Sequence, residues 1–181
     1  MQTLTRRAVL AGGTLAAGLA PRKPRAAEPA GLPDLHVLAP PKSLPPLRFR
    51  DAAGRVHTLA EYHGRGVVLN LWATWCAPCV AELPSLDRLA RALRGSRIAV
   101  LALSSDQGGA AVVRRFYATH HITALPVLLD PDGAVLSALH ARGVPTTYLV
   151  TPAGQEAGWI EGAQDWDAPA SIARVKALIG G

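Results

Sequence analysis

The chain has 181 residues, of which 49% are hydrophobic and 18% charged, and this composition predicts one globular domain with an ordinary core. Its formal net charge of +6 comes almost entirely from the first 27 residues, which hold five of the 19 basic residues and no acidic one. The rest of the chain has 14 basic and 13 acidic residues, so its charge gives no support to a nucleic-acid-binding function.

Residues 1–27 have the layout of an export signal. A basic start is followed by 13 small or apolar residues (8–20) and then by a second basic group. The apolar run is too short to cross a bilayer comfortably as a helix, and the Arg6-Arg7 pair favours a signal of the twin-arginine type. We predict a periplasmic protein, with general secretion or an uncleaved anchor as the alternatives for this leader.

The next stretch, residues 28–45, is rich in proline and is predicted to form an extended spacer outside regular elements. The folded domain is predicted over residues 46–181. Its first element should be a short hairpin over 47–62. The almost unbroken apolar run VVLNLW (67–72) then predicts a strand that is buried on both faces.

Helical and strand patterns alternate after this run. Apolar residues at helical spacing continue as far as Gly95, and a closing helix begins near Asp167. Between them the sequence predicts strands at 97–104 and 125–130, a helix after Asp106, a short helix at 134–140 and a hairpin at 146–162. The alternation predicts an α/β fold whose central mixed sheet is flanked by helices on both faces.

The only two cysteines, Cys76 and Cys79, lie in the motif WCAPC directly after the apolar run. A disulfide that closes so short a loop removes little chain entropy and contributes little as a structural staple. A structural zinc site needs four ligands, and the sequence has no second cysteine or cysteine-histidine cluster. Haem attachment requires a histidine where Val80 stands. A chemical role therefore explains the motif best.

A Cys-x-x-Cys pair at the end of a buried strand places its first sulfur at the N-terminus of the following helix. Unpaired N–H groups and the helix dipole stabilise a thiolate there. We predict that Cys76 is an exposed, thiolate-forming nucleophile. Cys79, one turn further on and facing inward, should attack the same sulfur and resolve a mixed disulfide.

The segment VVLNLWATWCAPCVAELP (67–84) resembles the active-site segment of the thioredoxin superfamily, and specifically of its TlpA/ResA-like exported thiol-disulfide oxidoreductases. A second segment, GVPTTYLV (143–150), resembles the superfamily's cis-proline strand. The resemblance implies a thioredoxin-like fold over roughly residues 45–180, with a helix-strand insertion at 108–130 and a cis Pro145 that faces the disulfide. Substrate contacts are expected beside the disulfide, from Trp75, Ala77, Pro78, Val144 and Thr146.

Glu82 is the candidate base for the proton of Cys79. Thioredoxins proper carry a buried aspartate at the position of Asn70, and an asparagine cannot titrate. Glu82 lies three residues after Cys79, on a neighbouring face of the predicted helix. The TlpA/ResA-like proteins have a glutamate there, and the resemblance implies that it tunes the cysteines and handles the Cys79 proton. The alternative is an ordinary first-turn glutamate favoured by the helix dipole.

The resemblance implies a monomeric periplasmic enzyme that reduces disulfides in other exported proteins. A membrane thiol-transfer protein of the CcdA/DsbD type would recharge it. The redox group is the Cys76-Cys79 disulfide, and we expect no other cofactor, no metal and no nucleic-acid partner. Cytochrome c maturation and copper-centre assembly are candidate pathways, although reductases dedicated to cytochrome c maturation often carry an acidic residue directly after the cis-proline, where this chain has Thr146.

Two other classes of protein remain as alternatives. A Sco-type copper-binding assembly protein expects three residues between its cysteines and a downstream histidine, whereas here two residues separate them and His140 is the only plausible ligand. A thiol peroxidase expects a threonine three residues before its cysteine, whereas Thr74 stands two residues before Cys76.

Overall fold

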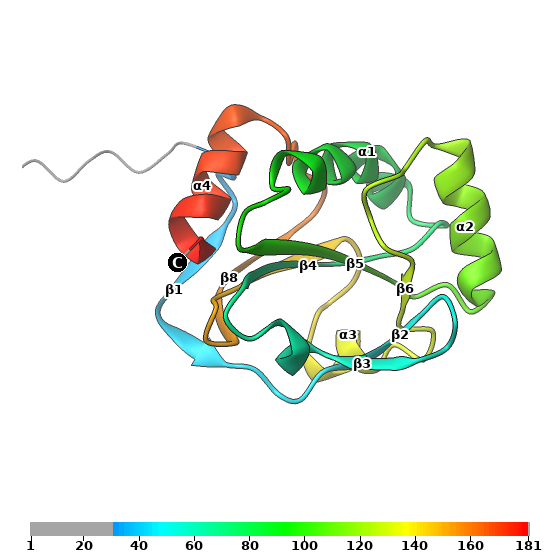
Figure 1. Cartoon of the computed structure of the whole chain (residues 1–181), viewed down its shortest axis with the longest axis horizontal. Helices are drawn as coiled ribbons and strands as arrows, with labels where there is room; N and C mark the ends of the chain where they lie inside the picture. The colour runs from blue at the N-terminus through cyan, green and yellow to red at the C-terminus, as the bar shows by residue number, and fades with distance from the viewer. Residues whose placement is uncertain (1–30, 181) are drawn as a thin grey trace, which may run out of the picture.

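The structure, a computed structural model, describes residues 31–180 (Figure 1). The predicted export signal (1–27) and residues 28–30 of the predicted spacer lie outside the described residues. Within residues 31–180, no helix is both long and apolar enough to span a bilayer.

The apolar run before the cysteines forms β4 (Gly66–Trp72), and every residue of this strand is buried. β4 is hydrogen-bonded on both edges, in parallel to β5 (Ile98–Ser104) and antiparallel to β7 (Thr146–Val150). Both of its faces are also covered, since its alternate side chains belong to two different cores. The strand that leads to the cysteines is therefore held rigidly at the centre of the sheet.

Within residues 31–180, eight strands form one mixed sheet in the order β1-β8-β7-β4-β5-β6-β2-β3. The remaining strands are β1 (His36–Ser43), β2 (Arg48–Asp51), β3 (Val56–Thr58), β6 (Leu128–Leu129) and β8 (Gln155–Glu161). The predicted N-terminal hairpin is confirmed, because β2 and β3 pair antiparallel. Gly54 in its turn has a φ of 83°, a conformation that glycine adopts without strain.

Helices cover both faces of the sheet, as predicted (Figure 1). One face carries α1 (Ala77–Ala92), α2 (Gly109–Thr119) and α4 (Pro169–Ile179), and the other carries the short helix α3 (Ala134–Ala138) and the 3-10 turn η1 (Leu59–Tyr62). The sheet therefore separates two apolar cores. The larger core, on the α1 side, contains Trp72 and both cysteines.

The predicted helix-strand insertion forms α2 and β6, but its strand is shorter than expected. The sequence pattern predicted a strand over 125–130, and only two residues of it pair in the sheet. Pro126 has no backbone N–H to donate to a strand ladder, so the start of this segment stays outside the sheet.

The prediction that the proline-rich stretch lies outside regular elements is wrong. Residues 36–43 form the edge strand β1, which pairs antiparallel with β8. Prolines are tolerated there because one side of an edge strand needs no ladder hydrogen bonds. The close approach also depends on Gly158 in β8, where an added Cβ would lie 2.6 Å from the carbonyl oxygen of His36.

Asp87 fastens α1 to the loop that follows α2. Its buried carboxylate accepts hydrogen bonds from three successive backbone N–H groups, those of Thr123, Ala124 and Leu125, at 3.0, 2.6 and 3.3 Å. It also pairs with Arg91 one turn later in the helix. This one side chain therefore satisfies donors that no strand or helix would otherwise pair.

We predict that Asp87→Ala lowers the free energy of unfolding by about 3 kcal/mol, because it leaves three backbone N–H groups without their acceptor and removes the carboxylate that pairs with Arg91. Urea unfolding measures the change. The control is Arg88→Ala, which removes the more exposed ion pair of Arg88 with Asp167 and should cost less than about 1 kcal/mol. Equal losses in the two variants would contradict an anchoring role for Asp87.

Candidate active site

Cys76 and Cys79 form a disulfide at the start of α1, with their Cα atoms 5.2 Å apart. Cys76 is the N-cap residue of the helix, and its Sγ accepts a hydrogen bond from the Cys79 N–H at 3.3 Å. Pro78 occupies the first turn, where the missing N–H costs no helical hydrogen bond. A negatively charged sulfur at Cys76 would therefore be stabilised by a backbone donor and by the helix N-terminus.

The prediction that Cys76 is exposed requires correction. Cys76 has 6% of its surface exposed and Cys79 has none, so both belong to the buried core. The loop before β7 covers the sulfur, because the carbonyl oxygen of Val144 lies 3.5 Å from Cys76 Sγ. Cys76 is still the only one of the two that solvent or a substrate can reach. Trp75 beside it is 70% exposed and is free to contact a partner.

The peptide bond between Val144 and Pro145 is cis, as the resemblance implied. A hollow of about 310 Å³ lies along this loop, lined by Pro78, Arg142, Gly143, Val144, Pro145, Thr146, Glu161 and Gly162. Three of the five predicted substrate contacts, Pro78, Val144 and Thr146, line it, and the other two, Trp75 and Ala77, lie exposed in the cysteine motif. The structure thus places the cis-proline loop and the disulfide side by side.

Thr146 lines this hollow, but almost none of its side chain is exposed there. It is 1% exposed, and its hydroxyl donates to the Gly143 carbonyl oxygen at 2.7 Å. Arg142 and Glu161 pair at 2.6 Å on the rim and give the hollow its charged groups. The Thr146 hydroxyl therefore shapes the loop, and this side chain leaves almost no exposed surface for the predicted substrate contact.

Glu82 lies inside the protein beneath the cysteine motif and is 2% exposed. Its Oε2 accepts hydrogen bonds from the Trp166 Nε1–H and the Gln164 backbone N–H, both at 3.0 Å. Its Oε1 accepts one from the Asn70 Nδ2–H at 2.9 Å. Burial raises the pKa of Glu82 above its ordinary value, and the three hydrogen bonds oppose this rise only in part. The alternative of an ordinary first-turn glutamate is excluded, since Glu82 is buried and lies beyond the first turn.

Comparison with known proteins agrees with this arrangement. The family model described as the AhpC/TSA family matches residues 38–155, which is more than half of the chain. The chain belongs to the AhpC/TSA family.

Individual relatives carry more specific names than the family model does. This AhpC/TSA chain is 31% identical over 111 residues to the thiol-disulfide oxidoreductase ResA of Geobacillus kaustophilus, and the match covers 61% of the chain and 63% of that relative. The chain thus aligns with less than two thirds of the length of this curated relative. The resemblance to TlpA/ResA-like proteins is confirmed.

Solved structures confirm the thioredoxin-like fold. The exposed lipoprotein thioredoxin Etrx1 of Streptococcus pneumoniae is 28% identical, with a TM-score of 0.62 over 74% of this chain and 100% of that one. A thiol:disulfide interchange protein of the thioredoxin family from Chlorobium tepidum is 19% identical, with a TM-score of 0.62 over 78% and 97% of the two chains. At 19% identity the second likeness concerns the fold alone.

Sequence reasoning missed two groups of residues in the site of this AhpC/TSA chain. The first is the pair of donors to Glu82 Oε2, Gln164 and Trp166, which lie more than 80 residues further along the chain. The second is Asp106, which accepts from the Thr74 hydroxyl at 2.6 Å and from Thr74 N–H at 2.9 Å. Asp106 follows β5 as Thr74 follows β4, and adjacent ends of parallel strands are a signal that sequence reasoning can use.

His140, the one copper ligand considered from the sequence, does not line the hollow beside the disulfide. It lines a separate hollow together with Tyr148 and Trp159. In residues 31–180, no three or more His, Cys, Asp or Glu side chains form a group that could hold a metal ion.

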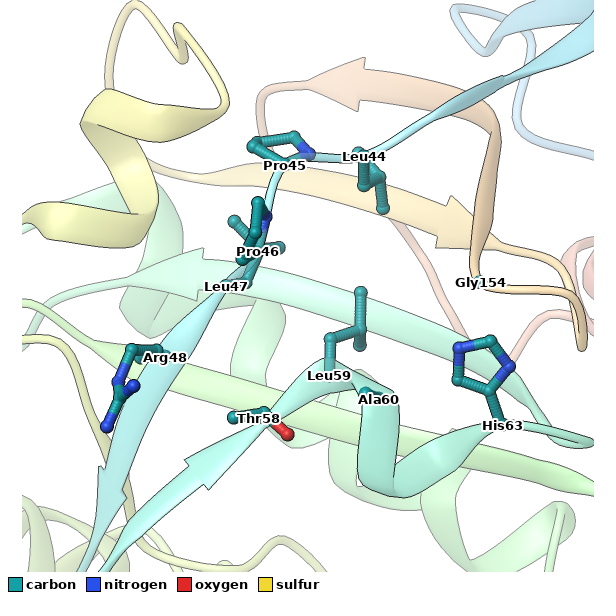
Figure 2. A pocket seen from close by; sticks show the side chains of 10 residues that line it. All are labelled: Leu44, Pro45, Pro46, Leu47, Arg48, Thr58, Leu59, Ala60, His63 and Gly154. Carbon is teal, nitrogen blue, oxygen red and sulfur yellow. The ribbon is translucent and has the colours of Figure 1, made fainter.

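A further hollow, of about 340 Å³, lies on the α3 side of the sheet (Figure 2). Its walls come from residues 44–48, from η1 and from the turn at Gly154, and His63 points toward it from the end of η1. Five of its ten lining residues are Leu or Pro, and neither cysteine lines it. This hollow therefore offers no group for disulfide exchange, and the hollow beside the cysteine motif remains the candidate site.

Proposed function

We propose that this chain is an exported thiol-disulfide oxidoreductase that reduces disulfides in other exported proteins. The observation that carries the proposal is the Cys76-Cys79 disulfide at a helix N-terminus, with the cis Val144-Pro145 loop 3.5 Å from Cys76 Sγ. The names of its relatives support disulfide exchange, and the word "exposed" in the name of the pneumococcal structure supports a place outside the cytoplasm. The predicted signal over residues 1–27 supports the periplasm.

The reaction proceeds in two exchanges. The Cys76 thiolate attacks one sulfur of the substrate disulfide, the substrate S–S bond breaks, and the other substrate sulfur leaves as a thiolate. Cys79 then loses its proton and attacks Cys76 Sγ, which releases the second substrate sulfur and forms the Cys76-Cys79 disulfide. Two electrons pass to the substrate. A membrane dithiol protein of the CcdA/DsbD type returns the pair to its reduced state.

Glu82 is the proposed acceptor of the Cys79 proton. Both side chains are buried on α1, three residues apart, and water has little access to either. A carboxylate whose pKa is raised by burial is a stronger base than an exposed one, which favours proton transfer from a thiol.

Peroxidase chemistry is the second candidate, because the family model carries the AhpC/TSA description. The geometry argues against it. The Thr74 hydroxyl donates to Asp106 Oδ1 at 2.6 Å, so its proton is engaged away from any oxygen bound at Cys76. Copper-centre assembly and cytochrome c maturation are the pathways in which we propose to look for the substrate. Nothing in the proposed chemistry requires more than one copy of the chain.

We predict that the dithiothreitol-reduced protein reduces insulin disulfides and that Cys76→Ser lowers this activity to the rate of the buffer. Thiol release measures the activity, and hydrogen peroxide consumption is measured in parallel. The control is Ser137→Ala, an exposed position on α3, which should match the wild type. Rapid peroxide turnover without insulin reduction would overturn the proposal in favour of a peroxidase.

A further inference from the structure

Asn70 lies at the centre of β4, is fully buried, and has one end of its amide without a partner among the residues that the structure describes. Its Nδ2 donates to Glu82 Oε1 at 2.9 Å and to Thr147 Oγ1 at 2.8 Å. Its Oδ1 is buried and has no hydrogen-bond partner in the described part of the chain. Buried polar atoms are nearly always paired in proteins, so this oxygen calls for a physical explanation.

The hydrogen bonds of Glu82 determine where that side chain can hold a proton. Oε2 already accepts from Trp166 Nε1–H and from the Gln164 N–H, so a proton on Oε2 would face two donors. Within residues 31–180, Oε1 accepts only from Asn70. The proton therefore belongs on Oε1. A proton on the Oε1 lone pair that faces Asn70 would meet the Nδ2–H of that residue, and two donors cannot bond to each other.

We propose that Asn70 turns its side-chain amide over when Glu82 takes up a proton, and that it thereby positions Glu82 in both protonation states. The two ends of an amide have nearly the same shape, so half a turn exchanges Oδ1 and Nδ2 with no change in packing. After the turn, Oδ1 accepts from Glu82 Oε1–H and from the Thr147 hydroxyl. Oδ1 thereby gains two donors, while Nδ2 gives up its two acceptors and takes the place that Oδ1 holds now.

This inference deepens the proton step proposed above and rests on it. In that step the Cys79 S–H bond breaks, an O–H bond forms at Glu82 Oε1, and no electron moves. The turn of Asn70 removes the clash that would otherwise oppose the new O–H bond. The turn also changes the hydrogen bond between Asn70 and Thr147, which lies two residues after Pro145 on β7.

The surroundings of Glu82 leave Asn70 as the group that responds. From β4 and from the segment after β8 the neighbours are neutral amides and an indole, and from α1 the titratable neighbour is Cys79. Glu82 has no ion-pair partner within residues 31–180. In the described part of the chain, no charged side chain therefore competes with Asn70 for the proton-bearing oxygen.

The first test uses the oxidised wild-type chain, in which neither cysteine titrates. Carbon NMR of the Glu82 carboxyl group follows its protonation with pH, and NOEs from the Asn70 side-chain N–H protons to Thr147 report which amide end faces the hydroxyl. We expect these NOEs above the Glu82 midpoint and their loss through that same midpoint. NOEs that persist unchanged in the protonated state would overturn the proposal.

The second test compares two variants by the same titration. Trp166→Phe removes a group that can only donate, so it should raise the pKa of Glu82. Asn70→Leu removes a group that serves both states, so the rise should be less than half as large. A rise equal to that of Trp166→Phe would overturn the proposal. If Asn70→Leu does not fold, the wild-type NOEs still decide the question.

These tests need no substrate and no free thiol, which keeps them separate from the reductase proposal. Failure of the insulin assay would leave the Asn70 result standing. Conversely, an Asn70 amide that never turns would leave disulfide exchange by Cys76 and Cys79 unaffected.

Discussion

Replacing Cys79 with alanine should leave the protein joined to its substrate through a persistent mixed disulfide on Cys76. Cys79 is the disulfide partner of Cys76 and the only other cysteine of the chain, so no sulfur remains to release the substrate. Expression of the full chain in its exported form, followed by alkylation and non-reducing separation, should yield adducts that mass spectrometry identifies. The adducts should dissociate on addition of dithiothreitol.

The matched control is Cys76→Ala, which keeps one cysteine but removes the accessible one. Cys79 has no exposed surface, so this variant should capture no partner. Equal capture by the two variants would mean that either sulfur can attack, which would contradict the roles assigned from the full burial of Cys79. Absence of any adduct with Cys79→Ala would contradict the assignment of disulfide reduction.

Glu82→Gln should make the folded protein more stable at neutral pH. Burial raises the pKa of Glu82, so the folded state holds this proton more tightly than the unfolded chain does. The stability from this group is complete below the ordinary carboxyl pKa and is lost as pH rises through the raised folded value. Glutamine does not titrate and loses nothing over that window. Below about pH 4 the two proteins should agree within about 0.5 kcal/mol.

Urea unfolding at a series of pH values measures this difference in stability. Glu61→Gln is the control, because the pKa of Glu61 is shifted in the opposite direction. The hydrogen bond from His57, followed by that from the Thr58 N–H, lowers the pKa of Glu61. Its contribution is present above the ordinary carboxyl pKa and is lost as pH falls through the lowered value, so this variant should be less stable at neutral pH. If the free energy of unfolding changed with pH in the same way for wild type and Glu82→Gln, the raised pKa of Glu82 would be contradicted.

The same Glu82→Gln variant should be a slower enzyme although it is a more stable protein. Loss of the base should slow release of the mixed disulfide by about 10²-fold near neutral pH. Attack by Cys76 should change much less, because its sulfur is stabilised by the Cys79 N–H and the helix N-terminus. Stopped-flow kinetics measures the two steps separately. Equal slowing of both steps would mean that Glu82 supports the structure of the site and does not act as the base for Cys79.

The main elements of the fold were predictable from local patterns. The apolar run at 67–72 predicted a strand buried on both faces, and the apolar spacing after Cys79 predicted α1. Both elements could be predicted because each pattern involves residues that are close together in the sequence. β1 was missed because prolines argue against a strand, and only its position at the sheet edge beside Gly158 makes them acceptable. β6 was overestimated since pairing partners, not propensity, set its length.

In the site, the sequence by itself determined Cys76, Cys79 and the proline loop, because each belongs to a short contiguous motif with chemistry of its own. It also marked Glu82 and Asn70 as unusual. Only the tertiary structure decided which groups they bond, since Asn70, Glu82 and Trp166 lie far apart in the chain and meet through the packing of β4, α1 and the segment after β8. The reason is that hydrogen-bond partners are chosen by distances in space. Those distances placed two donors on one carboxylate oxygen and left Asn70 Oδ1 without any donor among residues 31–180.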